Sequence, residues 1–256
     1  MRAAPPSPGI ERIEAYFAGP GFDPHRHDTY AIGYTIAGVQ AFRYRGAGRQ
    51  SLPGEVFVLH PDETHDGRAG TPAGFRYRIL YIEPRLIGAA LNAPLPFWRE
   101  PVSNDGRLAR AIKAALDDLA APLEELRRDQ IVVEIADALA AGGSGTKSVP
   151  APHRRAVTRA REFLDAQRGA VPSVALEAVT GMTRYALARD FRACLGTSPY
   201  RYLVMRRLDR ARALIRSGTP LAEAALRCGF ADQSHMTRQF KQAYGLSPGR
   251  YAVMAA

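Results

Sequence analysis

The chain has 256 residues, and because single cores of roughly 100–150 residues are typical, this length favours two domains. No apolar run reaches the about 20 residues of a membrane-spanning helix, the N-terminus lacks the apolar region of a signal peptide, and two cysteines are too few for a disulfide framework. These features exclude membrane-spanning and disulfide-stabilised secreted classes, and they predict a cytoplasmic protein. The cysteines, Cys194 and Cys228, are expected to act as small buried hydrophobes.

The two halves of the chain differ in charge. Residues 1–141 contain 16 Lys and Arg against 18 Asp and Glu, a net charge of −2, and residues 142–256 contain 19 against 7, a net charge of +12. The two values sum to the +10 of the whole chain. Because the positive charge belongs to one half, that half is expected to bind a polyanion.

Residues 10–82 show the short alternating apolar pattern of β-strands. The clearest strand signals lie at 30–36, 42–45, 55–59 and 75–82. Many short strands separated by Gly and Pro predict a small antiparallel barrel or jelly roll.

Two amphipathic helices are expected after the β-region. Leu108, Ile112, Ala115, Leu116 and Leu119 form one apolar stripe, and a second segment carries Leu126, Val133, Ile135 and Leu139. These helices could pack on the barrel or pair with another copy of the chain. We favour the second, because most oligomers have two-fold symmetry, and we expect a homodimer.

A Gly- and Ser-rich stretch at residues 142–152 predicts a flexible linker between domain 1–141 and domain 153–256. After it, capping and periodicity predict an all-α domain of seven helices. They are expected at 153–168, 174–180, 184–195, 199–217, 221–227, 233–244 and 248–254. The fourth helix spans about 28 Å at about 1.5 Å per residue. That length could place two flanking units in adjacent major grooves, which are about 34 Å apart.

Two similar segments in this domain suit DNA reading. In Gly229–Pro248, Asp232 can cap a helix whose Met236 and Phe240 face a core while polar side chains face outward. The segment 182–199 repeats its order of aliphatic residue, Phe, basic residue, Gly and Pro. A short helix with an apolar back and an amide- and guanidinium-bearing front can enter the major groove.

The C-terminal half resembles the AraC/XylS family of bacterial transcription regulators over about one hundred residues. The resemblance rests on the run Arg207–Ile215 and on Gly229-Phe230, Ser234, Phe240-Lys241, Gly245, Ser247-Pro248 and Tyr251. It implies two helix-turn-helix units joined by a linker helix, with the third and sixth helices of the domain as readers.

The reader positions carried over from the family are Arg184, Tyr185, Ala188, Arg189 and Arg192 on the third helix, and Gln233, Ser234, His235 and Arg238 on the sixth. Ala188 departs from a hydrogen-bonding reader, because its methyl group can only touch a thymine methyl. Phosphate contact is the alternative for the arginines, because such contacts position a protein without specifying sequence. Arg206, Arg207, Arg210 and Arg216 are expected on a solvated or DNA-backbone-contacting face of the linker helix.

The N-terminal half looks like the cupin-type barrel that heads many AraC-type regulators, and the whole fold is then a two-domain α+β protein. The candidate effector-binding residues are His25, His27, His65, Tyr34, Arg43 and Tyr77. The three histidines could instead hydrogen-bond only the barrel backbone, or they could hold a divalent metal. However, the carboxylate expected after His-x-His is replaced by Ala31 and Ile32, so we predict no metal and no cofactor.

The leading interpretation is a sequence-specific transcription regulator controlled by a small-molecule effector. Its expected partners are double-stranded DNA, the effector, a second copy of the chain and RNA polymerase. A metal-dependent cupin enzyme with a DNA-binding domain is the alternative, and a non-specific nucleoid protein is a third. No catalytic constellation appears in the sequence, and we predict that the protein is not an enzyme.

Overall fold

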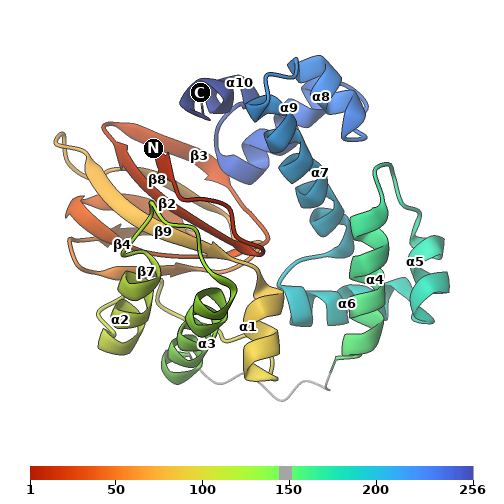
Figure 1. The fold of residues 1–256 in the computed structure, drawn as a ribbon, viewed down its shortest axis with the longest axis horizontal. Helices are drawn as coiled ribbons and strands as arrows, with labels where there is room; N and C mark the ends of the chain where they lie inside the picture. Colours follow the sequence, from red (N-terminus) through yellow and green to blue (C-terminus); the bar gives the residue numbers. More distant parts are fainter. Residues whose placement is uncertain (144–151, 256) are drawn as a thin grey trace. The chain divides into compact units, whose positions relative to one another are not determined.

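The computed structural model describes residues 1–143 and 152–255 (Figure 1). Clustering of contacts divides the chain into a first unit of Met1–Phe22 and Thr29–Pro150, and a second unit of Ala151–Ala256 together with Asp23–Asp28. Most of the predicted linker at 142–152 lies outside the described residues. Among the residues that are described, none of the helices combines the length and apolar character needed to span a membrane.

The first unit contains two β-sheets. The six-stranded sheet has the order β1 (Arg2–Ala3), β2 (Ile10–Phe17), β9 (Phe75–Ile82), β4 (Tyr30–Gly38), β7 (Val56–Leu59) and β10 (Val102–Ser103). The four-stranded sheet has the order β3 (Pro20–His25), β8 (His65–Ala69), β5 (Gln40–Tyr44) and β6 (Ala47–Ser51). The predicted antiparallel β-domain is confirmed, and its strands form two separate sheets in place of one closed barrel.

Aromatic side chains fill the space between the two sheets. Phe57 and Tyr77 of the six-stranded sheet lie with ring centroids 6.2 Å apart, and Phe57 lies 6.4 Å from Phe42 of the four-stranded sheet. Phe17 and Phe75 stack beside Tyr77. Each such buried ring contributes about 1.5–3 kcal/mol of hydrophobic stabilisation. Because this burial favours the apolar face of each strand, the alternation of apolar residues in the sequence determines which face turns inward.

Helices cover the other face of the six-stranded sheet (Figure 1). They are α1 (Pro84–Leu91), α2 (Gly106–Ala115) and α3 (Glu125–Gly142). Their apolar residues share one core with strands β4, β7 and β9; its members include Ile32, Val58, Leu80, Ile82, Leu108, Ile112, Ile135 and Leu139.

The apolar stripe expected for the second helix, α3, is wrong at two of its residues. Leu126 is 85% exposed and Val133 is 49% exposed, so neither belongs to the core. The buried face of α3 follows Ile131, Ile135 and Leu139 at spacings of four, and a residue seven positions from another shares its face. Leu126 and Val133 therefore form a separate exposed apolar strip on α3.

The second unit is all-helical, and the seven predicted helices are confirmed. They are α4 (Arg154–Ala166), α5 (Ser173–Thr180), α6 (Arg184–Leu195), α7 (Pro199–Arg216), α8 (Leu221–Arg227), α9 (Gln233–Tyr244) and α10 (Pro248–Ala255). Helices α4, α5 and α6 pack together, α8, α9 and α10 do so in turn, and α7 contacts both groups (Figure 1).

The turn between α8 and α9 requires glycine. Gly229 has φ +77°, and a Cβ at this position would lie 1.8 Å from the carbonyl oxygen of Arg168. The backbone of the α4–α5 connection therefore approaches this turn more closely than any side chain permits. Cys228, the residue before it, is buried as predicted, whereas Cys194 is partly exposed.

Candidate nucleic-acid interface and histidine cluster

Helix α9 is defined at both ends by its own sequence. The carboxylate of Asp232 accepts a hydrogen bond from the backbone N–H of His235 at 2.6 Å, and Gly245 ends the helix in the left-handed conformation. Met236 and Phe240 are fully buried. The opposite face therefore points away from the core of the unit.

The exposed face of α9 carries Gln233, Ser234 and Arg238. His235 is half-buried, because its ring packs edge-to-face on Phe230 with centroids 5.5 Å apart. Three side chains on one short helix thus present amide, hydroxyl and guanidinium groups, which are the chemical groups that hydrogen-bond base edges.

Helix α6 repeats this arrangement. The hydroxyl of Thr183 accepts from the N–H of Ala186 at 3.4 Å, and the carboxylate of Glu177 accepts from the N–H of Arg184 at 2.8 Å. Leu187 and Phe191 are buried behind the helix. The start of α6 is therefore fixed by two side-chain acceptors, one of them on the preceding helix α5.

The outer face of α6 is rich in arginine. Arg184, Arg189 and Arg192 are exposed, and Ala188 is partly buried. The ring of Tyr185 is 76% exposed and lies beneath the guanidinium of Arg184, 5.3 Å from its centroid. The side chain of Arg189 is 72% exposed, with its Nε 3.9 Å from the carboxylate of Asp190. Both helices expose their expected reader residues, apart from the partly buried Ala188 and His235, so the two faces are available for a groove.

The arginines of the linker helix α7 are expected on a solvated or DNA-backbone-contacting face; this is wrong for Arg207, which is buried, and Arg206 and Arg210 are only partly exposed. Arg207 is only 6% exposed, and burial lowers the pKa of its guanidinium. Arg206 lies 3.0 Å from the carboxylate of Asp28, and Arg210 donates to the carbonyl of Gln167 at 2.8 Å. Of the four, only Arg216 is exposed. Neighbouring helices and the segment Asp23–Asp28 surround α7, which the charge pattern alone does not reveal.

The segment Asp23–Asp28 belongs to the second unit and makes several backbone hydrogen bonds there. The N–H of Arg26 donates to Gln242 at 2.8 Å, and the N–H of Asp23 donates to Gly245 at 3.2 Å. The guanidinium of Arg201 donates to the carbonyl of Arg26. Sequence reasoning missed these contacts because they join residues about 175–220 positions apart.

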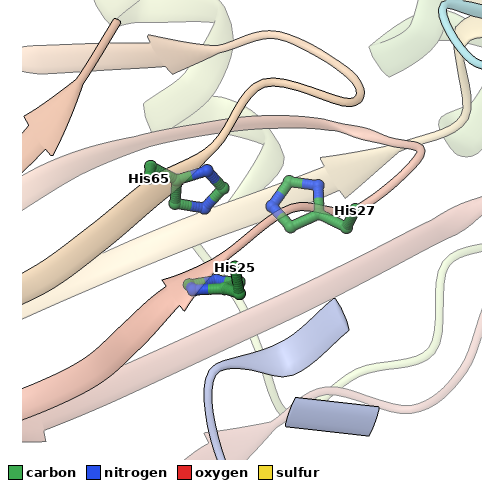
Figure 2. A group of neighbouring side chains, drawn as sticks. All are labelled: His25, His27 and His65. Carbon is green, nitrogen blue, oxygen red and sulfur yellow. The ribbon is translucent and has the colours of Figure 1, made fainter. Parts of the chain in front are cut away.

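Three of the expected effector-binding residues form a cluster of imidazoles (Figure 2). His25 ends β3, His27 follows two residues later, and His65 begins β8, the neighbouring strand of the sheet. All three side chains are buried, and one ring nitrogen of each lies within 4.8 Å of the others. The His-x-His spacing at the end of β3 and a single histidine at the start of β8 bring them together.

The other three expected residues lie outside this cluster, on strands β4, β5 and β9. Tyr77 is buried among the inter-sheet aromatic rings, where burial raises the pKa of its hydroxyl well above the usual value. Tyr34 packs toward the helices, with the ammonium of Lys113 5.8 Å from its ring centroid. Arg43 is exposed, whereas the alternation in the sequence left its direction open; its strand neighbours Phe42 and Tyr44 take the inward positions.

A buried histidine that the sequence did not single out is His60. Its Nε2 accepts a hydrogen bond from the N–H of Trp98 at 3.0 Å, and the Tyr44 hydroxyl accepts from its backbone N–H at 3.1 Å. Desolvation by burial and the charge of Arg45 lower the pKa of His60 to about 4. The imidazole is therefore neutral at physiological pH.

Two family models match the chain. An AraC-like ligand binding domain matches residues 7–136, and a helix-turn-helix domain matches residues 176–253. Among individual proteins, the transcriptional regulator YbfI of Bacillus subtilis is 28% identical over 236 residues, which cover 88% of this chain and 86% of YbfI. The transcriptional activator RhaS of Salmonella newport is 40% identical over 74 residues, 27% of each chain.

Solved structures of ToxT from Vibrio cholerae share the fold. One superposes with a TM-score of 0.69 at 9% identity, covering 98% of this chain and 99% of ToxT. Another, with an unsaturated fatty acid bound to ToxT, has a TM-score of 0.66 at 11% identity and covers 99% of this chain and 98% of ToxT. At these identities the likeness concerns the fold alone.

Proposed function

The chain belongs to the AraC-type family of DNA-binding transcription regulators with an N-terminal ligand-binding domain, and we propose that α6 and α9 read its operator. The observation that carries this proposal is the shared design of the two helices. Each has a side-chain cap at its start, a buried apolar back and an exposed front of base-capable groups. Two such helices on one basic unit favour sequence reading over phosphate contact alone.

Three of the reader residues have a specific base partner in this proposal. Arg189 and Arg238 are suited to bidentate contact with guanine, and Gln233 is suited to adenine. Helix α7, at 18 residues, spans about 27 Å, close to the about 34 Å between successive major-groove segments on one face of DNA. The two recognised blocks are therefore expected about one helical turn apart.

A small organic effector bound in the N-terminal ligand-binding domain, residues 7–136, is proposed to control this DNA binding. Support comes from the match to a ligand-binding domain and from a ToxT structure whose bound ligand is an unsaturated fatty acid, a carboxylic acid. His25, His27, His65 and Tyr77 are the polar groups proposed to meet the effector. Imidazoles and a hydroxyl suit an effector that carries carboxylate or hydroxyl oxygens.

We also propose that the chain acts as a homodimer. Leu126 and Val133 leave an apolar strip on α3 after its other face has been used in the core. A second copy of α3 would cover this strip in a two-fold arrangement. A dimer would place four reader helices on DNA, and contact with RNA polymerase would follow from binding near a promoter.

No catalytic step is proposed, and the relatives described above are named as regulators of transcription. The function is tested by selecting binding sites for the full-length protein from a library of random duplexes. The selection is expected to enrich one sequence with two conserved blocks, and the affinity should fall steeply with salt through counterion release. Binding without any sequence enrichment would overturn the proposal in favour of a non-specific DNA-binding protein.

A further inference from the structure

We propose that His25, His27 and His65 bind one divalent transition-metal ion. This inference goes beyond the organic effector proposed above, and it revises the expectation from the sequence that a missing carboxylate excludes a metal. The new observation is that all three imidazoles are buried and that their ring nitrogens lie within 4.8 Å of one another (Figure 2). Three imidazoles are a sufficient protein ligand set for an ion that keeps one or more open positions.

Hydrogen bonds determine which nitrogen of two rings is available to bind an ion. Nδ1 of His25 lies 2.8 Å from the carbonyl oxygen of Asp23, and Nδ1 of His65 lies 3.0 Å from that of Glu63. A carbonyl oxygen only accepts, so Nδ1 carries the proton and Nε2 carries the lone pair in both neutral rings. Metal-binding histidines are commonly oriented in this way, with the second ring nitrogen donating to a backbone carbonyl.

The distances are compatible with one ion after a small adjustment. Nitrogens bound tetrahedrally at about 2.0–2.1 Å from an ion lie about 3.3 Å apart. The cluster spans at most 4.8 Å between ligand atoms, so rotation of the rings about their side-chain torsions can close the difference. The ring centroids of His25 and His27 lie 6.1 Å apart.

The ligand chemistry selects the class of ion. Neutral imidazoles suit zinc, nickel, copper and iron, whereas magnesium and calcium need oxygen ligands. The carboxylates adjacent in sequence, Asp28 and Asp66, have other partners. Asp28 forms an ion pair with Arg206 at 3.0 Å, and Asp66 accepts a hydrogen bond from the backbone N–H of Arg43 at 2.6 Å. Ala31 and Ile32 offer no ligand. An ion on three imidazoles therefore keeps its double positive charge, and its open position can take water or a carboxylate oxygen of the proposed effector.

Two of the three ligands lie in a segment that contacts the DNA-binding helices. His25 and His27 alternate with Arg26 and Asp28, which meet Arg201 and Arg206 of α7. An ion bound to the two imidazoles would hold the backbone of this segment in one conformation.

Calorimetric titration of the chelator-stripped, full-length protein with zinc alone tests the proposal. We expect one ion per chain, and a fall in zinc affinity of more than about a hundredfold in His27→Ala and in His65→Ala, since even loss of an outer hydrogen bond to a ligand costs about 10–100-fold. The matched control is His153→Ala, because His153 lies outside the cluster and contacts Asp190. Its zinc affinity should equal that of the unchanged protein.

A second measurement guards against variants that fail to fold. Cobalt bound to three imidazoles gives visible absorption bands, which should appear in the unchanged protein and be lost in His27→Gln with its circular dichroism preserved. Absence of binding, or binding that survives both cluster substitutions in folded protein, would overturn the metal site. The operator selection is performed after chelation, so loss of the metal claim leaves sequence-specific DNA binding separately testable.

Discussion

The carboxylate of Asp232 accepts a hydrogen bond from the backbone N–H of His235 at 2.6 Å, and this contact sets where helix α9 begins. It satisfies one of the N–H groups that a helix start leaves without a partner. The same contact orients the first turn, which carries Gln233 and Ser234. A cap and a reading surface are therefore built from the same four residues.

Removing this cap is expected to weaken both the fold and DNA binding. Asp232→Ala should lower the free energy of unfolding by about 1 kcal/mol, because Ala cannot accept the hydrogen bond. Asp232→Asn is the matched control, since its side-chain oxygen keeps the cap. Denaturant unfolding of the two variants measures the difference, and equal stabilities would show that the cap contributes nothing.

Gly229→Ala should destabilise the second unit by about 3 kcal/mol or more. The substitution adds a methyl group against the carbonyl of Arg168 in a left-handed conformation that itself costs about 1–2 kcal/mol. Gly181→Ala is the control, because Gly181 has a similar φ of +70° but open space around the added carbon. Thermal unfolding should show a clearly smaller loss for Gly181→Ala, and similar losses would contradict the close approach.

Charge on the exposed strip of α3 is expected to separate the proposed dimer. Leu126→Glu and Val133→Glu should each raise the dimer dissociation constant at least about tenfold, because a carboxylate would be desolvated at the contact. Gln50→Glu on β6, a strand of the four-stranded sheet, is an exposed control away from α3. Sedimentation velocity over a concentration series measures the change; an unaltered monomer–dimer balance in both variants would place the interface elsewhere.

The buried His60 predicts how stability depends on pH. Its folded-state pKa of about 4 lies below the ordinary value of 6.5, so the unfolded chain binds a proton more readily as pH falls below 6.5. The stabilisation from neutral His60 is therefore complete above about pH 6.5 and decreases toward pH 4, by up to about 3 kcal/mol. The free energy of unfolding, measured at several pH values, should lose part of this slope in His60→Gln. An identical slope would assign the pH dependence to other groups.

The helical domain was largely predictable from the sequence because its signals are local. Asp232 and Gly245 act within one turn of helix α9, and Met236 and Phe240 follow its spacing of four, so capping and periodicity report these relationships directly. The β-domain was predicted only in outline, since pairing between β3 and β8 joins distant segments. Successive side chains of a strand point to opposite faces of its sheet. Whether Arg43 faces inward therefore depends on which face of the four-stranded sheet packs against the six-stranded sheet.

Contacts of the segment Asp23–Asp28 could not be predicted for the same reason. Arg206 has the charge of a DNA-contacting residue, and only the fold shows that Asp28 lies beside it. The histidines were recognised as a group, yet the sequence alone suggested that a missing carboxylate excludes a metal. Their burial and the orienting carbonyls of Asp23 and Glu63 became visible only with the structure.

The most direct test of the account is the base preference of Arg189→Ala and Arg238→Ala, measured by binding-site selection with the full-length protein. Each substitution should weaken binding to the selected site by about 1–3 kcal/mol. Each should also relax the choice of base in a different block, with the two blocks about one helical turn apart. Arg216→Ala, at the exposed end of α7, should leave both blocks unchanged. A uniform loss of affinity over all sequences in both reader variants would show that α6 and α9 contact phosphate, and would contradict their role as readers.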